Sequence, residues 1–306
     1  MKRAIRRETR RKPMPISLAY RGLYVSDPAA STHFYEGLGF AVLHEDERLD
    51  APQGKVKTLR NRQGVTLRLN HLPAPGLRTG GKRRPMTALG PTHLNFYVAD
   101  YDETLATVRA RGGDVATETR IAYTQDGSST DMIYCTDPDG IRVEVWTTVP
   151  YGPGGFSTAI PGVSRKFSHS GICVRDLDQS IAFYEALGFV RAEVFDYRDP
   201  PGQLDPMFEE TGSSAIAQMM RNGDDVIELL HFLNPAPLYR EEYAVPGNAG
   251  FFDIGFHVPS LAEARAALPG ATQGWSGDDR VESGSLRILD PNGVRIELVE
   301  VKKGDL

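Results

Sequence analysis

The strongest constraint on the fold is that the chain repeats itself. Residues 34–40 read Phe-Tyr-Glu-Gly-Leu-Gly-Phe, and residues 183–189 read Phe-Tyr-Glu-Ala-Leu-Gly-Phe. Downstream, Asp-Pro-Asp-Gly at 137–140 precedes Ile-Arg-Val-Glu, and Asp-Pro-Asn-Gly at 290–293 precedes Val-Arg-Ile-Glu. Two copies of one pattern indicate an internal duplication, so both halves should share a fold. Positions at which the copies differ should then show where function lies.

Each half divides again into two units with one pattern: a strand, a helix and three further strands. In the first unit we expect a strand at 18–25, a helix at 27–38 and two strands within 55–72. Gly39 is placed to end the helix. The other three units begin near residues 93, 167 and 252. The pattern therefore predicts an α+β chain of four βαβββ modules.

The length of 306 residues suits two domains. A Pro- and Gly-rich stretch, Val-Pro-Tyr-Gly-Pro-Gly-Gly, marks the boundary between the halves. The sequence thus predicts a basic flexible tail at 1–15, an N-terminal domain at 16–147, a linker at 148–165, a C-terminal domain at 166–301 and a short tail at 302–306. We assign no function to the basic tail, because like-charged terminal runs are usually solvated.

Composition excludes several classes of protein. With 40% hydrophobic and 25% charged residues, the chain matches ordinary soluble proteins, and it has no apolar run of membrane-spanning length. Cys135 and Cys173 lack a Cys-x-x-Cys spacing, so we expect them to be buried and reduced in a cytoplasmic protein. The net charge of −5 gives no reason to expect a nucleic-acid partner. We expect a monomer or homodimer that acts on a small molecule away from membranes.

The combination of a Phe-Tyr-x-x-Leu-Gly-Phe helix end with an Asp-Pro-[Asp/Asn]-Gly hairpin resembles the vicinal oxygen chelate superfamily. That group includes glyoxalase I, methylmalonyl-CoA epimerase, extradiol dioxygenases, and fosfomycin- and bleomycin-resistance proteins. The resemblance covers about residues 16–301. It implies two tandem glyoxalase-like domains whose modules pair, so that their curved mixed sheets form cups. Each module would offer one metal ligand on its first strand and one on its last.

The resemblance assigns eight ligand positions in this chain. The first-strand positions are Tyr20, His93, His169 and Asp253, and the last-strand positions are Arg68, Glu144, Glu228 and Glu297. Period-two alternation places Arg142, Glu144 and Trp146 on one strand face, which supports the inward assignment of Glu144. Modules two and three retain the complete His and Glu set, whereas modules one and four have lost it.

If module two pairs with module three, one cup contains His93, Glu144, His169 and Glu228. This set resembles the metal site of glyoxalase I and of the epimerases, and it would hold one divalent ion: Zn, Ni, Co, Mn or Fe. The degenerate second cup would contain Tyr20, Arg68, Asp253 and Glu297. We expect that cup to be metal-free, since Arg68 would supply positive charge to acids that would otherwise be buried unpaired.

The competing arrangement pairs modules within each half, as in two-domain extradiol dioxygenases. The metal would then lie in the C-terminal half, among His169, Glu228, Asp253 and Glu297, while the N-terminal cup would contain Tyr20, Arg68, His93 and Glu144. Pairing across the halves is the more economical account, because it leaves one site intact and concentrates all losses in the other.

A four-ligand cup implies, by resemblance, a divalent-metal-dependent lyase or isomerase that moves a proton through a metal-stabilised enolate of a small, oxygen-bearing substrate. Either Glu144 or Glu228 would be the catalytic base, and the two histidines would hold the metal. Two alternatives stay open. An extradiol-type ring-cleaving dioxygenase would need iron or manganese on two histidines and one carboxylate. A metal-free small-molecule binding or resistance protein would not need the ligand set.

Overall fold

The structure is a computed structural model that describes residues 16–47, 55–72, 84–125, 128–149, 157–239, 248–268, 272–273 and 284–302. The basic tail predicted at 1–15 lies outside the described residues, as does the middle of the predicted linker. None of the helices in the described ranges is long and apolar enough to span a membrane.

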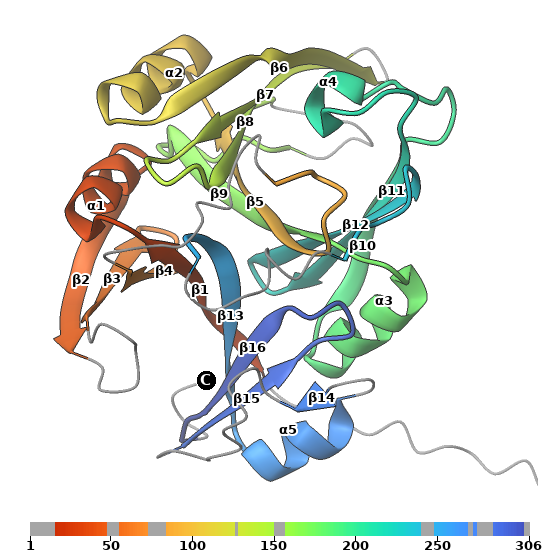
Figure 1. Cartoon of the computed structure of the whole chain (residues 1–306). Coiled ribbons are helices and arrows are strands. Elements are labelled where there is room, and N and C mark those ends of the chain that lie inside the picture. The colour runs from red at the N-terminus through yellow and green to blue at the C-terminus, as the bar shows by residue number, and fades with distance from the viewer. Residues whose placement is uncertain are drawn as a thin grey trace, which may run out of the picture.

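The elements follow the predicted modular order (Figure 1). In the N-terminal half they are β1 (Ser17–Val25), α1 (Pro28–Gly37), β2 (Phe40–Glu47), β3 (Lys55–Asn61), β4 (Thr66–His71), β5 (Gly90–Val98), α2 (Tyr101–Ala110), β6 (Asp114–Gln125), β7 (Ser128–Thr136) and β8 (Arg142–Thr147). In the C-terminal half they are β9 (Arg165–Cys173), α3 (Leu177–Ala186), β10 (Val190–Asp196), α4 (Asp205–Phe208), β11 (Ser214–Asn222), β12 (Asp225–Asn234), β13 (Gly250–Val258), α5 (Leu261–Ala267), β14 (Thr272–Gln273), β15 (Ser285–Leu289) and β16 (Arg295–Glu300). The short helix α4 is an addition to module three that the repeat pattern did not predict.

The module helices begin where a polar side chain caps their first turn. Asp27 accepts hydrogen bonds from the backbone N–H groups of Ala29 and Ala30, which would otherwise lack partners. Asp100, Asp176 and Ser260 cap α2, α3 and α5 in the same way. At the other end of α1, Gly39 takes a φ of 92°, as the predicted helix stop requires.

The strands form two eight-stranded sheets, neither of which closes into a barrel. The site sheet, as we call it, has the order β10-β11-β12-β9-β5-β8-β7-β6 and joins modules two and three. The second sheet has the order β14-β15-β16-β13-β1-β4-β3-β2 and joins modules four and one. The predicted pairing across the halves is therefore confirmed.

The alternative pairing within halves is wrong, because β9 lies beside β5 and not beside β13. His169 and Glu228 thus belong to the site sheet, while Asp253 and Glu297 belong to the second sheet. These four residues do not form one ligand set. The two tandem domains each contribute one module to each sheet.

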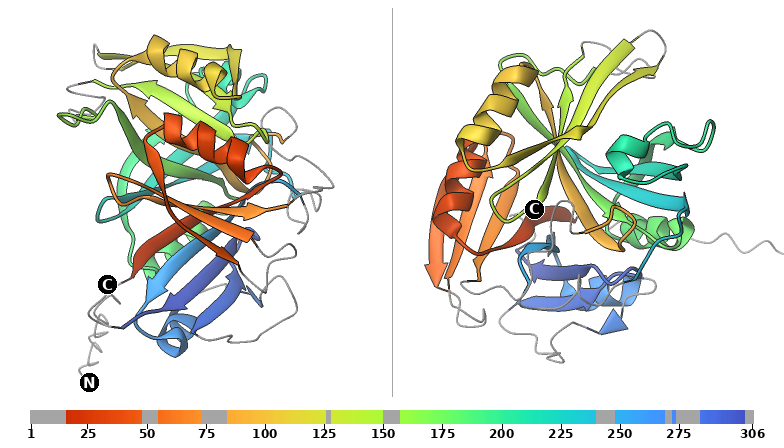
Figure 2. Two further views of the ribbon diagram at one scale, coloured as in Figure 1. Left: turned by 90° about the vertical axis from the view of Figure 1, so that its left-hand side faces the viewer. Right: turned by 45° about the horizontal axis from the view of Figure 1, so that its top comes forward.

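One face of each sheet packs, together with the helices, into a single shared hydrophobic core. Figures 1 and 2 show α1 and α2 side by side, while α3 and α5 lie toward the other end of the molecule. Within the N-terminal half, the Tyr35 hydroxyl donates to Asp137 over 3.1 Å. Within the C-terminal half, the Tyr184 hydroxyl donates to Asp290 over 3.2 Å. The two repeated motifs therefore contact each other, and their recurrence reflects a shared structural role.

Candidate metal centre

The seam between β5 and β9 brings the two histidines together. These strands run antiparallel, with His93 opposite Gly171, two residues beyond His169. Strand β8 lies parallel to β5 on one side, and β12 lies parallel to β9 on the other. Because side chains alternate along each strand, Glu144 of β8 and Glu228 of β12 fall on the same face as the histidines.

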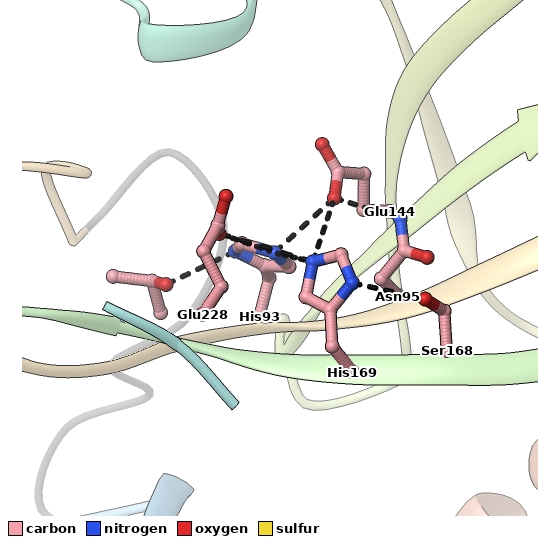
Figure 3. Close-up of polar contacts among 7 residues, drawn as sticks. His93, Asn95, Glu144, Ser168, His169 and Glu228 are labelled. Atoms are coloured by element: carbon pink, nitrogen blue, oxygen red, sulfur yellow. Dashed lines mark hydrogen bonds and ion pairs between the residues drawn. The ribbon is translucent and has the colours of Figure 1, made fainter. Parts of the chain in front are cut away.

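The four side chains point toward one another (Figure 3). The Nε2 atoms of His93 and His169 are 3.3 Å apart. The Nε2 atom of His93 lies 3.2 Å from the Oε2 atom of Glu144 and 3.4 Å from that of Glu228. The Nε2 atom of His169 lies 3.8 Å from each of the same two oxygens. The structure thus assembles the complete set predicted from the sequence.

Neighbouring hydroxyl groups orient both imidazoles. The hydroxyl oxygen of Thr92 lies 3.0 Å from Nδ1 of His93, and that of Ser168 lies 3.1 Å from Nδ1 of His169 (Figure 3). With Nδ1–H donating to the hydroxyl oxygen, each Nε2 atom keeps its lone pair for a ligand at the centre. This arrangement is typical of metal-binding histidines.

Asn95 holds one of the two carboxylates, and the sequence analysis did not identify it. Its Nδ2 atom donates to Oε2 of Glu144 over 2.8 Å, which fixes the carboxylate beside His93. In the other three modules, the residue two positions beyond the first-strand ligand position is Gly22, Gly171 or Gly255. This exception was visible in the sequence and could have identified Asn95.

The seam glycine in β9 is required by close approach. A Cβ atom added at Gly171 would lie 2.2 Å from Cε1 of His93. In the second sheet, a Cβ atom at Gly255 would lie 2.0 Å from the ring of Tyr20. No side chain fits at either distance, so glycine lets the opposite strand place its functional side chain over the seam.

Burial and neighbouring charges shift the pKa values of the groups at this centre in different directions. Burial raises the pKa of Glu228 to about 7. Burial also disfavours the charged form of Glu144, but His93 opposes burial through its charge and its hydrogen bond, and the pKa of Glu144 is lowered to about 2. Burial and the charge of His93 lower the pKa of His169 to about 3. Because these groups lie so close together, a proton bound by one of them changes the pKa values of the others.

The donor set fits a divalent cation. Two neutral imidazoles and two buried carboxylates are ligands that ions such as Zn²⁺ or Mn²⁺ accept. Tetrahedral ligands about 2.1 Å from an ion lie about 3.4 Å apart, close to the 3.2–3.8 Å separations between the imidazole nitrogens and the other donors. Ligand atoms of His93, His169 and Glu228 all lie within 4.8 Å of one another.

The second sheet places its four predicted residues at the equivalent seam, between β1 and β13. The Tyr20 hydroxyl donates to Glu297 over 2.5 Å, and Nη1 of Arg68 donates to the same oxygen over 2.8 Å. The Arg68 guanidinium also stacks 3.4 Å from the centre of the Tyr20 ring. A guanidinium therefore occupies the face that bears the histidine and glutamate set in the site sheet.

From the sequence we expect Arg68 to neutralise both acids, but in the structure it pairs directly only with Glu297 among the residues described. The carboxylate of Asp253 instead lies 3.7 Å from Nη1 of Arg295 and accepts a hydrogen bond of 2.8 Å from the Tyr24 hydroxyl. Arg287 lies 3.7 Å from the other oxygen of Glu297. The salt bridges on this face were predicted correctly, but three arginines, not Arg68 alone, lie beside the two acids. That this face binds no metal stays a prediction.

The helix α4 covers part of the ligand face of the site sheet. It lies between β10 and β11 in the sequence and contacts β6, the strand at the opposite edge (Figure 1). It takes part in a small apolar cluster separate from the main core, whose members include Tyr134, Leu204, Met207, Phe208, Leu230 and Phe232. Because Leu230 and Phe232 alternate with core residues along β12, this cluster lies on the same face as Glu228.

Comparison with known proteins gives the family. The sequence model of the glyoxalase/bleomycin resistance protein/dioxygenase superfamily matches residues 17–145 and again residues 166–298. The chain belongs to this superfamily. The resemblance that the repeated motifs suggested, and the two tandem glyoxalase-like domains that it implied, are thereby confirmed. No curated protein sequence matches the chain.

Solved structures of the superfamily share the fold over nearly the whole chain. Glyoxalase I from Zea mays is 18% identical, with a TM-score of 0.63 over 93% of this chain and 92% of that one. A putative dioxygenase from Bacillus subtilis subsp. subtilis str. 168 is 16% identical, with a TM-score of 0.57 over 95% of this chain and 86% of that one. At these identities the likeness establishes the fold and leaves the reaction to the site.

Proposed function

We propose that this superfamily member is a divalent-metal-dependent lyase or isomerase that moves a proton within a small, oxygen-bearing substrate. The observation that carries the proposal is that, at the β5–β9 seam, the two imidazole nitrogens lie 3.3 Å apart and 3.2–3.8 Å from both carboxylates. Membership of a superfamily that includes glyoxalase I supports it.

In this proposal the histidines hold the ion and a glutamate moves the proton. His93 and His169 present Nε2 while hydroxyl groups fix their Nδ1 atoms. A bound divalent ion would stabilise negative charge on a substrate oxygen, which makes a neighbouring C–H group acidic. Glu144 is fixed by Asn95, so it serves as a stationary ligand. Among the residues that the structure describes, no amide donor is seen on Glu228, which makes it the better proton acceptor.

The test combines metal content with proton exchange. Purified protein should contain about one divalent ion per chain, and His93→Ala should lose it. In D₂O, the loaded protein should catalyse deuterium exchange at C–H groups beside the carbonyl in a panel of α-hydroxy and α-oxo carbonyl compounds, followed by NMR. Glu228→Gln keeps an oxygen ligand but cannot accept a proton, so it should keep the ion and lose exchange. Exchange that survives in Glu228→Gln but disappears in Glu144→Gln would reverse the two roles.

One observation favours a second candidate, an extradiol-type ring-cleaving dioxygenase. The ligand atoms within 4.8 Å of one another come from two histidines and one glutamate, His93, His169 and Glu228. Two histidines and one carboxylate are the ligand set of non-haem Fe(II) oxygenases. Oxygen uptake by Fe(II)-loaded protein in the presence of catechols distinguishes this candidate. Uptake that depends on Glu228 and not on Glu144 would favour it over the proton shuttle.

A further inference from the structure

A buried arginine lies beside the candidate metal centre. Arg142 stands two residues before Glu144 on the same face of β8, and its backbone pairs with that of His93 in β5. Its guanidinium is 5.7 Å from the ring centre of Tyr134, and that ring is 5.7 Å from the ring of His93. The side chain of Arg142 is only 2% exposed. A permanent positive charge is therefore held within reach of a small ligand at the centre.

The anion that balances this charge comes from the end of α4, the helix that covers part of the ligand face. Nη1 of Arg142 donates to the backbone carbonyl of Arg84 over 2.6 Å, and Nη2 forms an ion pair with the carboxylate of Glu209. Glu209 directly follows α4, and its side chain is 24% exposed. Glu209 is thus the more exposed partner of this ion pair.

The backbone of Glu209 is held in an unfavourable conformation. Its φ of 55° makes it the one non-glycine residue with positive φ among those that the structure describes. This left-handed conformation costs about 1–2 kcal/mol for a residue with a Cβ atom. Glu209 takes this conformation as the residue that ends α4, where its backbone N–H donates to the carbonyl of Asp205.

The equivalent arginine of the second sheet is paired differently. Arg295 follows Asp-Pro-Asn-Gly as Arg142 follows Asp-Pro-Asp-Gly, and it lies 3.7 Å from Asp253 within its own sheet. Asp253 holds the position that His93 holds in the site sheet. Because an imidazole carries no negative charge, His93 cannot balance a guanidinium, and the anion for Arg142 has to come from elsewhere. Glu209 now fills that role, and a ligand with its own carboxylate fits it equally well.

We propose that Arg142 anchors a carboxylate of the substrate, and that Glu209 occupies this anchor until the substrate replaces it. The substrate class is a small carboxylic acid whose oxygen atoms at the other end reach the His and Glu centre, so the inference rests on the proposed function. Exchange of one carboxylate for another keeps the buried guanidinium paired, which avoids the penalty of an isolated buried charge. The planar guanidinium also suits two-point recognition of a carboxylate.

The test uses two probes with the same metal-chelating end. Acetohydroxamate is neutral beyond the chelating group, whereas succinohydroxamate adds a carboxylate. Dissociation constants for both are measured by calorimetry on the zinc-loaded full chain. The wild type should bind the acid about tenfold tighter, since a charge-assisted pair contributes about 1.4 kcal/mol or more. Glu209→Gln should raise this preference about another tenfold, because the competing carboxylate is gone. Arg142→Gln should abolish it and leave acetohydroxamate binding within about threefold.

Matched variants separate the carboxylate from its surroundings. Glu210→Gln removes the same charge one residue away and should leave the preference unchanged. Glu209→Gly removes both the carboxylate and the backbone strain, and should match Glu209→Gln in preference. Equal preference in the wild type, Arg142→Gln and Glu209→Gln would overturn the anchor alone, even if both probes bind. Failure of acetohydroxamate to bind the zinc-loaded wild type would overturn the metal centre, and the anchor with it.

Discussion

The two sheets of this protein have equivalent strand orders but carry opposite chemistry on their ligand faces. In the site sheet, two imidazoles and two carboxylates meet at the seam. In the second sheet, Arg68 lies against Tyr20 and Glu297 at the equivalent seam. On the core side the two halves are alike, because Tyr35–Asp137 in one half and Tyr184–Asp290 in the other each join a module of one sheet to a module of the other. One scaffold thus carries either a His and Glu set or a guanidinium beside its buried acids.

The largest expected difference between the sheets is in metal affinity. His93→Ala removes one of four ligands and should lower affinity for Zn²⁺ at least about 100-fold, whereas Asp253→Ala, at the equivalent position of the second sheet, should change it less than about threefold. Competition with a chromophoric chelator measures both. Equal losses in the two variants would mean that the sheets do not differ as their side chains indicate.

Arg68 is predicted to neutralise buried acid in the second sheet, as the proposed ion would in the site sheet. Arg68→Met removes the closer of the two arginines described beside the buried Glu297, leaves Arg287 at 3.7 Å, and should destabilise the protein by about 3 kcal/mol. Adding Glu297→Gln should recover much of that loss, since no buried charge is then left unpaired. Denaturant titration of the single and double variants in the presence of excess metal measures both effects. A double variant as unstable as Arg68→Met would contradict the pairing.

The seam glycines allow the same backbone change to be compared in both sheets. Gly171→Ala places a Cβ atom against His93 and should weaken Zn²⁺ binding about tenfold by displacing the imidazole. Gly255→Ala presses on Tyr20 instead and should lower stability by about 1–3 kcal/mol with metal affinity unchanged. Chelator competition and denaturant titration of both variants check this. Loss of metal affinity in Gly255→Ala would show that the two seams are not independent.

The repeated motifs predicted the fold, and the family resemblance that they carry named the four side chains that the structure brings together. Alternation placed Glu144 on the ligand face, and the unequal loss of His and Glu residues among the modules favoured the pairing that the structure has. The contacts that sequence reasoning missed join segments far apart in the chain. Glu209 reaches Arg142 from an insertion with no counterpart in the repeat, and Arg295 neutralises Asp253 across strands. No local pattern encodes such contacts, although comparison of the four modules would have identified Asn95.

The smallest expected difference lies on the core face, where the two sheets should respond alike to pH. Burial, with the nearby charge of Asp139, raises the pKa of Asp137 to about 7, and burial raises that of Asp290 to about 6. An unfolded Asp has a pKa of about 3.9. Each folded carboxyl therefore holds its proton more tightly, so its contribution to stability is fully present below about pH 4 and is lost as pH rises through the folded pKa.

Between pH 5 and pH 8, the wild type should lose about 2.5 kcal/mol through Asp137 and about 1.5 kcal/mol through Asp290. Asp137→Asn and Asp290→Asn keep the shape of the side chain and should each remove their own part of this slope. Urea titrations at several pH values measure the slopes. If Asp137→Asn keeps the slope of the wild type, the buried proton lies elsewhere. If the two motif variants behave in nearly the same way, the core faces have stayed equivalent while the ligand faces diverged, and the duplication has changed only the chemistry at the seams.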